Sequence, residues 1–174
     1  SVIDLTTGEN TVYETNSEIV RDKLAWGEAA RFIKLYDPKE IAIWTKSLEV
    51  DKETCKHRLE LSKQKIHIYQ DEKELSIKSK LSYQNEVLQK IFKPSGFLTP
   101  IEYVDLETWS YARMAYLLLI QFAYEHDEQI VNNIRKPILW DESDTLILAN
   151  HTITQLNIVN PHYTYSSISK QDSL

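Results

Sequence analysis

The sequence predicts a mixed α+β fold: an antiparallel meander of three to four strands (about 39–80), packed against an N-terminal helix and a long buried helix (about 105–126). Two observations predict this fold. Apolar and polar residues alternate through residues 40–50 and 54–70, with the period of two that half-buried strands show. In residues 105–126 apolar side chains are spread almost all round a helix, which is typical of a helix buried on most sides.

Length and composition indicate one globular domain. The chain has 174 residues, of which 42% are hydrophobic and 26% are charged, and these proportions are ordinary for soluble proteins. We therefore expect a single α+β domain over 1–174, with 1–10 and 166–174 as candidate flexible tails. Cys55 is the only cysteine, so an internal disulfide is excluded and an intracellular location, nuclear or cytoplasmic, is expected.

The N-terminal third begins with short extended segments. "VIDL" (2–5) and "TVYE" (11–14) flank a turn-rich stretch. Apolar residues then recur at helical spacing as far as Tyr36, which predicts a helix that starts near residue 17. Asp37-Pro38 should end it, because the residue before a proline avoids the helical conformation.

Residues 54–70 are interpreted as a β-hairpin with a tight turn near Lys63-Gln64. Arg58 then lies beside Tyr69 on one face of the hairpin, as a half-buried antiparallel pair requires. The opposite face carries four apolar side chains: Leu59, Leu61, Ile66 and Ile68. Residues 75–81 add a further strand or begin the next helix.

The long buried helix follows a shorter helix predicted at 82–92, and Asp105 has the side chain of an N-cap for it. Its uninterrupted apolar run, Met114–Ile120, is far shorter than the ~20 residues that span a bilayer, so no membrane association is expected. A narrow polar stripe centred on Arg113 is either its water-facing edge or a contact with a partner. Three further elements are expected beyond it: a helix at 128–136, a strand at 137–140, and a strand or hairpin at 145–159 whose apolar spacing also suits a helix.

Sequence motifs typical of phosphate-binding, metal-binding or catalytic sites are weak or missing. The three glycines are too far apart for a phosphate-binding loop. Cys55 and His57 would share one strand face, without a third metal ligand nearby. Helix capping and turns explain the acidic clusters at 125–128 and 141–144 more simply than a metal does. We expect no cofactor and no metal site, and we favour a non-catalytic protein over an enzyme.

Charge is unevenly distributed along the chain. Residues 46–93 hold 11 Lys/Arg against 8 Asp/Glu, a net charge of +3, whereas the rest of the chain carries −9 and the whole chain −6. Because lysine and arginine neutralise phosphates, this stretch is a candidate nucleic-acid-binding sheet face. The simpler alternative is a solvated sheet face without a ligand.

The segment "VIDLT", residues 2–6, resembles a SUMO-interacting motif. In such motifs an extended apolar peptide adds to the edge of a partner's sheet. The resemblance implies that Val2, Ile3, Asp4 and Leu5 bind a partner. The alternative is that these residues form the first strand of the domain itself.

Taken together, these patterns favour a non-catalytic protein–protein interaction module, an adaptor or scaffold subunit of an intracellular complex. The order of a helix, a meander and a buried helix is similar to that of RWD-like interaction domains. The expected partner is another protein, SUMO or a complex subunit. Eight residues are predicted to bind it: Val2, Ile3, Asp4, Leu5, Arg58, Lys65, Tyr69 and Arg113. The alternative function is an enzyme or a nucleic-acid-binding domain that uses the basic sheet face at 46–93.

Overall fold

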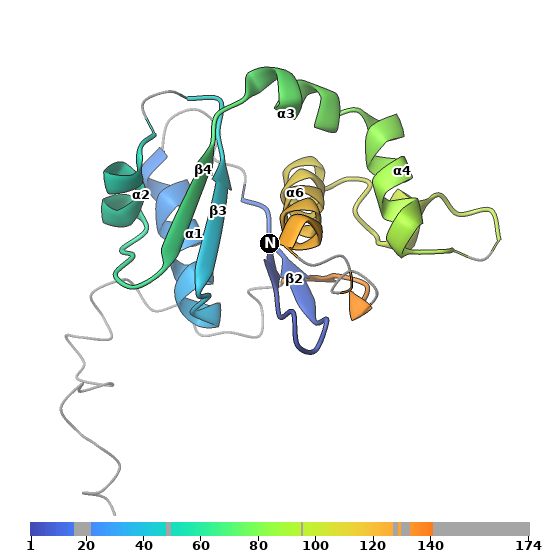
Figure 1. Cartoon of the computed structure of the whole chain (residues 1–174), viewed down its shortest axis with the longest axis horizontal. Coiled ribbons are helices and arrows are strands. Elements are labelled where there is room, and N and C mark those ends of the chain that lie inside the picture. The colour runs from blue at the N-terminus through green and yellow to red at the C-terminus, as the bar shows by residue number, and fades with distance from the viewer. Residues whose placement is uncertain (16–21, 48–49, 95, 127–128, 130–132, 141–174) are drawn as a thin grey trace, which may run out of the picture. The chain divides into compact units, whose positions relative to one another are not determined.

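The computed structural model describes residues 1–15, 22–47, 50–94, 96–126, 129 and 133–140, which form six helices and two small sheets within one compact unit (Figure 1). The fold is mixed α+β, as predicted. The elements in chain order are β1 (Val2–Ile3), β2 (Asn10–Val12), α1 (Asp22–Tyr36), β3 (Glu40–Trp44), α2 (Lys52–Arg58), β4 (Lys65–Tyr69), α3 (Glu72–Lys78), α4 (Leu81–Ile91), α5 (Pro100–Tyr103), α6 (Ser110–His126) and β5 (Ile138–Leu139). Two predictions fall outside the described residues: the strand or hairpin at 145–159 and the tail at 166–174. The helix predicted at 128–136 is described only in part, and its last residues, 134–136, are not helical.

β2 is the central strand of a three-stranded sheet with the order β1-β2-β5. β1 runs antiparallel to β2 with Val2 opposite Thr11, and β5 runs parallel to β2 with Ile138 opposite Thr11. Gly8 has a φ of 74° in the turn between β1 and β2, where the backbone of Asn133 leaves no space for a side chain. Both extended segments predicted near the N-terminus are therefore strands of one sheet.

The antiparallel meander predicted at about 39–80 is wrong. β3 and β4 form a separate two-stranded sheet and run parallel, with Glu40 opposite Lys65 and Trp44 opposite Tyr69. The chain between them forms α2, and a crossover of this kind returns the second strand in the same direction as the first. Figure 1 shows α1 and α2 beside this pair of strands.

The hairpin predicted at 54–70 is wrong because its first half is a helix. Asp51 caps α2, since Asp51 Oδ1 accepts a hydrogen bond from the Thr54 N–H at 2.7 Å. Cys55 and Leu59 are buried four residues apart, whereas the three residues between them are exposed. Burial of residues four positions apart is typical of a helix. The same segment has an apolar or weakly polar residue at every second position, which also fits a strand.

The segment at 75–81, predicted as a strand or as the start of a helix, is helical. α3 ends at Lys78, and α4 begins at Leu81 close to the predicted start of that helix. Asp71 caps α3 by accepting a hydrogen bond from the Glu74 N–H at 3.0 Å. α3 therefore occupies the last part of the segment that the meander was expected to fill, and α4 follows directly after it.

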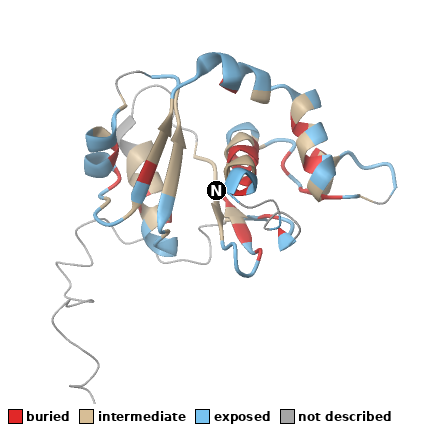
Figure 2. Ribbon diagram, viewed as in Figure 1, coloured by how far each residue is buried: buried red, intermediate tan, exposed pale blue. Residues whose placement is uncertain are grey.

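α6 is the central element of the core, and Figure 2 shows buried residues on it and on the helix α4 that packs against it. Seven α6 residues are buried: Ala112, Arg113, Tyr116, Leu117, Leu118, Ile120 and Ala123. The helix starts at Ser110 rather than at the predicted cap Asp105. Asp105 instead adopts a φ of 57° shortly after α5, whose own start is fixed by a capping box between Thr99 and Glu102.

Candidate functional site

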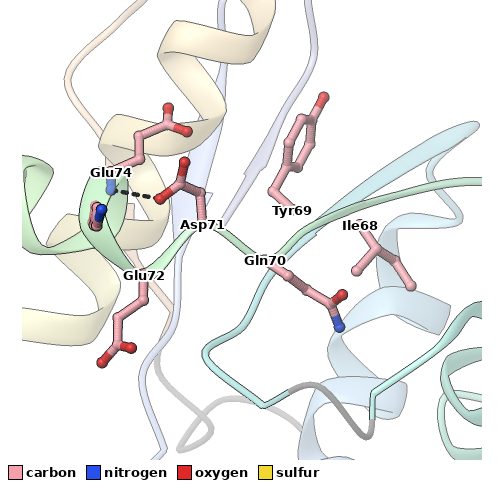
Figure 3. Close-up of a pocket in the computed structure, with 7 residues that line it drawn as sticks. Ile68, Tyr69, Gln70, Asp71, Glu72 and Glu74 are labelled. Atoms are coloured by element: carbon pink, nitrogen blue, oxygen red, sulfur yellow. Dashed lines mark hydrogen bonds between the residues drawn. The ribbon is translucent and has the colours of Figure 1, made fainter.

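An open hollow lies at the carboxyl end of β4 and is lined by Ile68–Glu74 (Figure 3). Ligands of parallel sheets commonly bind at this end of the strands. Here, however, Asp71 already accepts the hydrogen bond from Glu74 N–H that caps α3. The lining of the hollow has three carboxylates, on Asp71, Glu72 and Glu74, and one cation, on Lys73. The hollow is therefore unsuited to phosphate.

Aromatic side chains join the β3–β4 sheet to α6. Trp44 and Tyr69, on neighbouring strands, stack with their ring centroids 5.0 Å apart and their planes at 12°. Phe122 of α6 meets Trp44 edge-on at 6.4 Å between centroids and His67 at 5.1 Å. Tyr69, one of the predicted partner-binding residues, is half-buried by these contacts, so its ring is committed to packing within the chain.

Glu40 links the two parallel strands at their amino ends. His67 Nε2 lies 2.9 Å from Glu40 Oε2, and Lys65 Nζ lies 3.4 Å from the same oxygen. These hydrogen bonds, that of His67 before that of Lys65, hold the pKa of Glu40 below its usual value. Lys65, another predicted partner-binding residue, is thus ion-paired on the surface, where such a pair stabilises the fold only slightly.

No group of three His, Cys, Asp or Glu side chains that could hold a metal ion occurs among the described residues. Cys55 and His57 do not share a strand face as predicted, because α2 buries the first and exposes the second. Burial raises the pKa of the Cys55 thiol, which keeps it in the unreactive protonated form. The acidic cluster at 141–144, and part of the one at 125–128, lie outside the described residues.

The VIDLT segment forms a strand and a turn of the chain's own sheet. Val2 and Ile3 make up β1, and Ile3 packs against the main core. Asp4 Oδ1 accepts a hydrogen bond from the Thr6 N–H at 2.8 Å, which closes the turn and lowers the pKa of Asp4. Leu5 is 45% exposed. Of the apolar residues in the segment, Leu5 is the one most open to solvent.

Arg113 lies inside the molecule and is 7% exposed. Its guanidinium donates hydrogen bonds to Gln84 Oε1 at 2.6 Å and to the backbone oxygens of Leu106 and Glu107 at 2.7 and 2.8 Å. The polar stripe predicted on the long helix therefore faces α4 at this position. Arg113 ties α4 to the segment that precedes α6.

The basic residues of 46–93 do not form the sheet face that was predicted. Lys65 is the only one of them that lies on a strand in the described part of the chain, because α2 and α3 form where strands of the meander were expected and α4 follows them. Arg58 lies on α2, with its guanidinium 5.2 Å from the centroid of the Trp26 ring. Four of the lysines are ion-paired: Lys56 with Glu53, Lys65 with Glu40, Lys78 with Glu74, and Lys90 with Glu86.

The loop between α4 and α5, which the sequence predicts, exposes two large apolar side chains that the sequence analysis did not single out. Phe97 is fully exposed and Leu98 is 54% exposed. Gly96 has a φ of 96°, a backbone conformation that glycine adopts readily. The available signal was the order Pro94, Gly96, Phe97, Leu98, because proline and glycine end the helix and leave two large apolar residues outside it.

Comparison with known proteins gives one informative similarity. No family model matches the sequence. The chain is similar to mutS homolog L359 of Acanthamoeba polyphaga mimivirus, which is named as a DNA mismatch repair protein. The two sequences are 26% identical over 179 aligned residues, which cover 92% of this chain and 16% of the viral protein. The chain thus spans about a sixth of the length of this relative.

This similarity contradicts the predicted adaptor or scaffold function and, with it, the SUMO-interacting interpretation of VIDLT. A short segment with three apolar residues and a β-forming sequence fits a docking peptide and a first strand equally well, which explains the wrong prediction. The alternative prediction, a nucleic-acid-binding domain, agrees better with the relative. In the described residues, no helix has the length and apolar character needed to cross a membrane.

Proposed function

We propose that this chain is one segment of a DNA mismatch repair protein similar to the viral mutS homolog, and that it contacts nucleic acid within that larger protein. The observation that carries the proposal is the similarity over 92% of the chain. The proposal places the protein inside the cell, where DNA is repaired. An unpaired, buried Cys55 is in keeping with that reducing environment.

Local cations, not the overall charge, would make the contact. The net charge of −6 repels a polyanion. Within 46–93 and away from the acidic hollow at the end of β4, several exposed lysines have no ion pair in the described structure: Lys46, Lys52, Lys63, Lys80 and Lys93. Such lysines are free to neutralise phosphates and release counterions.

Fluorescence anisotropy with a labelled DNA duplex tests the proposal. The chain is titrated into a fully paired duplex and into the same duplex with one mismatch, at 50 and at 200 mM salt. Three phosphate contacts would weaken binding roughly 40-fold between these salt concentrations, since each contributes about −0.9 to the slope of log K against log salt. The absence of binding, or an affinity that ignores salt, contradicts the proposal.

Single lysine variants identify the contacts. Lys46→Ala, Lys52→Ala, Lys63→Ala and Lys80→Ala are compared with Lys39→Ala, an exposed lysine outside 46–93 that also has no ion pair in the described structure. At least one of the four should lower the magnitude of the salt slope by about 0.9, and Lys39→Ala should leave it unchanged. Equal slopes in all five variants would contradict the assignment of DNA contacts to 46–93.

A further inference from the structure

The loop between α4 and α5 presents two large apolar side chains, Phe97 and Leu98, to solvent. Phe97 is fully exposed, and Leu98 is 54% exposed. Figure 1 shows this loop standing away from the helices that it connects. With Lys90 at the end of α4 and Lys93 just beyond it, these residues make up what we call the α4–α5 tip: Lys90, Lys93, Phe97 and Leu98.

The charge of the tip favours an anionic ligand. Residues 87–101 include two lysines, Lys90 and Lys93, and no Asp or Glu. Lys93 has no ion pair in the described structure. Lys90 Nζ lies 3.6 Å from Glu86 Oε1, but the two side chains are 72% and 70% exposed. An exposed pair of this kind is weak, so Lys90 can exchange it for a phosphate.

The apolar part of the tip is too small for a protein interface, which needs a much larger continuous surface. A projecting aromatic ring beside lysines is instead the arrangement that binds single-stranded nucleic acid, in which bases stack on aromatic side chains and cations follow the backbone. The bases of an intact duplex are stacked on one another and would not receive the ring.

We therefore propose that the α4–α5 tip binds single-stranded nucleic acid, with Phe97 stacked on an unpaired base, Leu98 against its neighbour, and Lys90 and Lys93 on the adjacent phosphates. This inference rests on the proposed function. It adds a ligand class, the unpaired strand, and the residues that recognise it.

The test uses the 174-residue chain, a labelled single-stranded DNA 20-mer and the duplex of the same sequence, with anisotropy measured across a range of salt. Phe97→Ala should weaken single-strand binding about tenfold without changing the salt slope, and Phe97→Trp should retain the affinity. Lys90→Ala combined with Lys93→Ala should reduce the magnitude of the slope by about 1.4, the value for two phosphates of a single strand. Because these side chains are exposed, the variants should fold.

Matched controls separate the tip from other surfaces. Tyr111→Ala removes another aromatic side chain, 73% exposed at the start of α6, and should bind like the unaltered chain. If Phe97→Ala binds the single strand like the unaltered chain, the inference fails while the proposed function stands on its duplex binding. Absence of binding to either DNA overturns both. If Phe97→Ala loses binding to vesicles of phosphatidylserine and phosphatidylcholine but keeps its DNA affinity, the tip is a lipid contact and the inference fails.

Discussion

The carboxylate of Glu14 caps the helix that contains Ala112: Glu14 Oε2 accepts hydrogen bonds from the Ala112 N–H at 2.8 Å and from the Tyr111 N–H at 2.9 Å. The residue before the helix is Trp109, and its indole offers no acceptor. A side chain that follows β2 therefore supplies the cap from 98 residues away. This contact fixes the start of the central core helix against the first sheet.

Glu14→Ala should lower the free energy of unfolding by about 1–2 kcal/mol, because two N–H groups at the positive end of α6 lose their acceptor. Glu14→Gln keeps an oxygen acceptor but not the charge, so it should cost less. Urea denaturation followed by circular dichroism measures both variants. Equal midpoints for Glu14→Ala and the unaltered chain would show that the cap contributes nothing.

Arg113→Met should destabilise the fold by about 3 kcal/mol. It leaves Gln84 Oε1 and the backbone oxygen of Leu106 buried without their donor, and each buried group without a partner costs about 1–3 kcal/mol. Arg135→Met is the control, since the ion pair of Arg135 with Glu9 is exposed on both sides and should contribute under about 1 kcal/mol. Equal losses in the two variants would contradict an internal role for Arg113.

Two glycines should respond to alanine with opposite signs. Gly8→Ala forces a Cβ to within 1.9 Å of the Asn133 oxygen at a φ of 74°, so we expect a loss of more than about 2 kcal/mol from the clash and the left-handed backbone. Gly27 lies within α1 with no atom near its missing Cβ, so Gly27→Ala should stabilise by about 0.5–1 kcal/mol. Thermal unfolding of both variants measures these changes. A higher melting temperature for Gly8→Ala would contradict the geometry of the β1–β2 turn.

Acid should weaken the capping box of α5. The Thr99 N–H donates to Glu102 Oε2 at 2.6 Å, and this hydrogen bond lowers the pKa of Glu102. A carboxyl group whose pKa is lowered in the folded state stabilises the fold above its unfolded pKa of about 4.3, and this stability disappears as the pH falls through the folded value. The urea midpoint should therefore fall less steeply below pH 4.3 in Glu102→Gln than in the unaltered chain. If the urea midpoints of Glu102→Gln and of the unaltered chain changed identically with pH, Glu102 would not contribute to the loss of stability in acid.

Local sequence determined the elements whose signals lie within a few residues. Apolar residues at helical spacing placed α4 correctly, and Asp37-Pro38 ended α1 at Tyr36. The apolar character of residues 114–120 was enough to identify a core helix, and the shortness of this run was enough to exclude a membrane-spanning helix there. Each of these features depends on backbone conformation or on the solvation of nearby side chains, so no distant contact was needed.

Only the tertiary structure decided how the elements meet. The segment that includes Cys55, His57 and Leu59 satisfies the period of a strand and that of a helix, and burial of Cys55 and Leu59 together selects the helix. With α2 in the connection, β4 returns parallel to β3, whereas the expected meander required antiparallel neighbours. The cap from Glu14 to α6 and the enclosure of Arg113 likewise depend on side chains far apart in sequence, because hydrogen-bond partners are chosen by distance in space, which a local pattern does not contain.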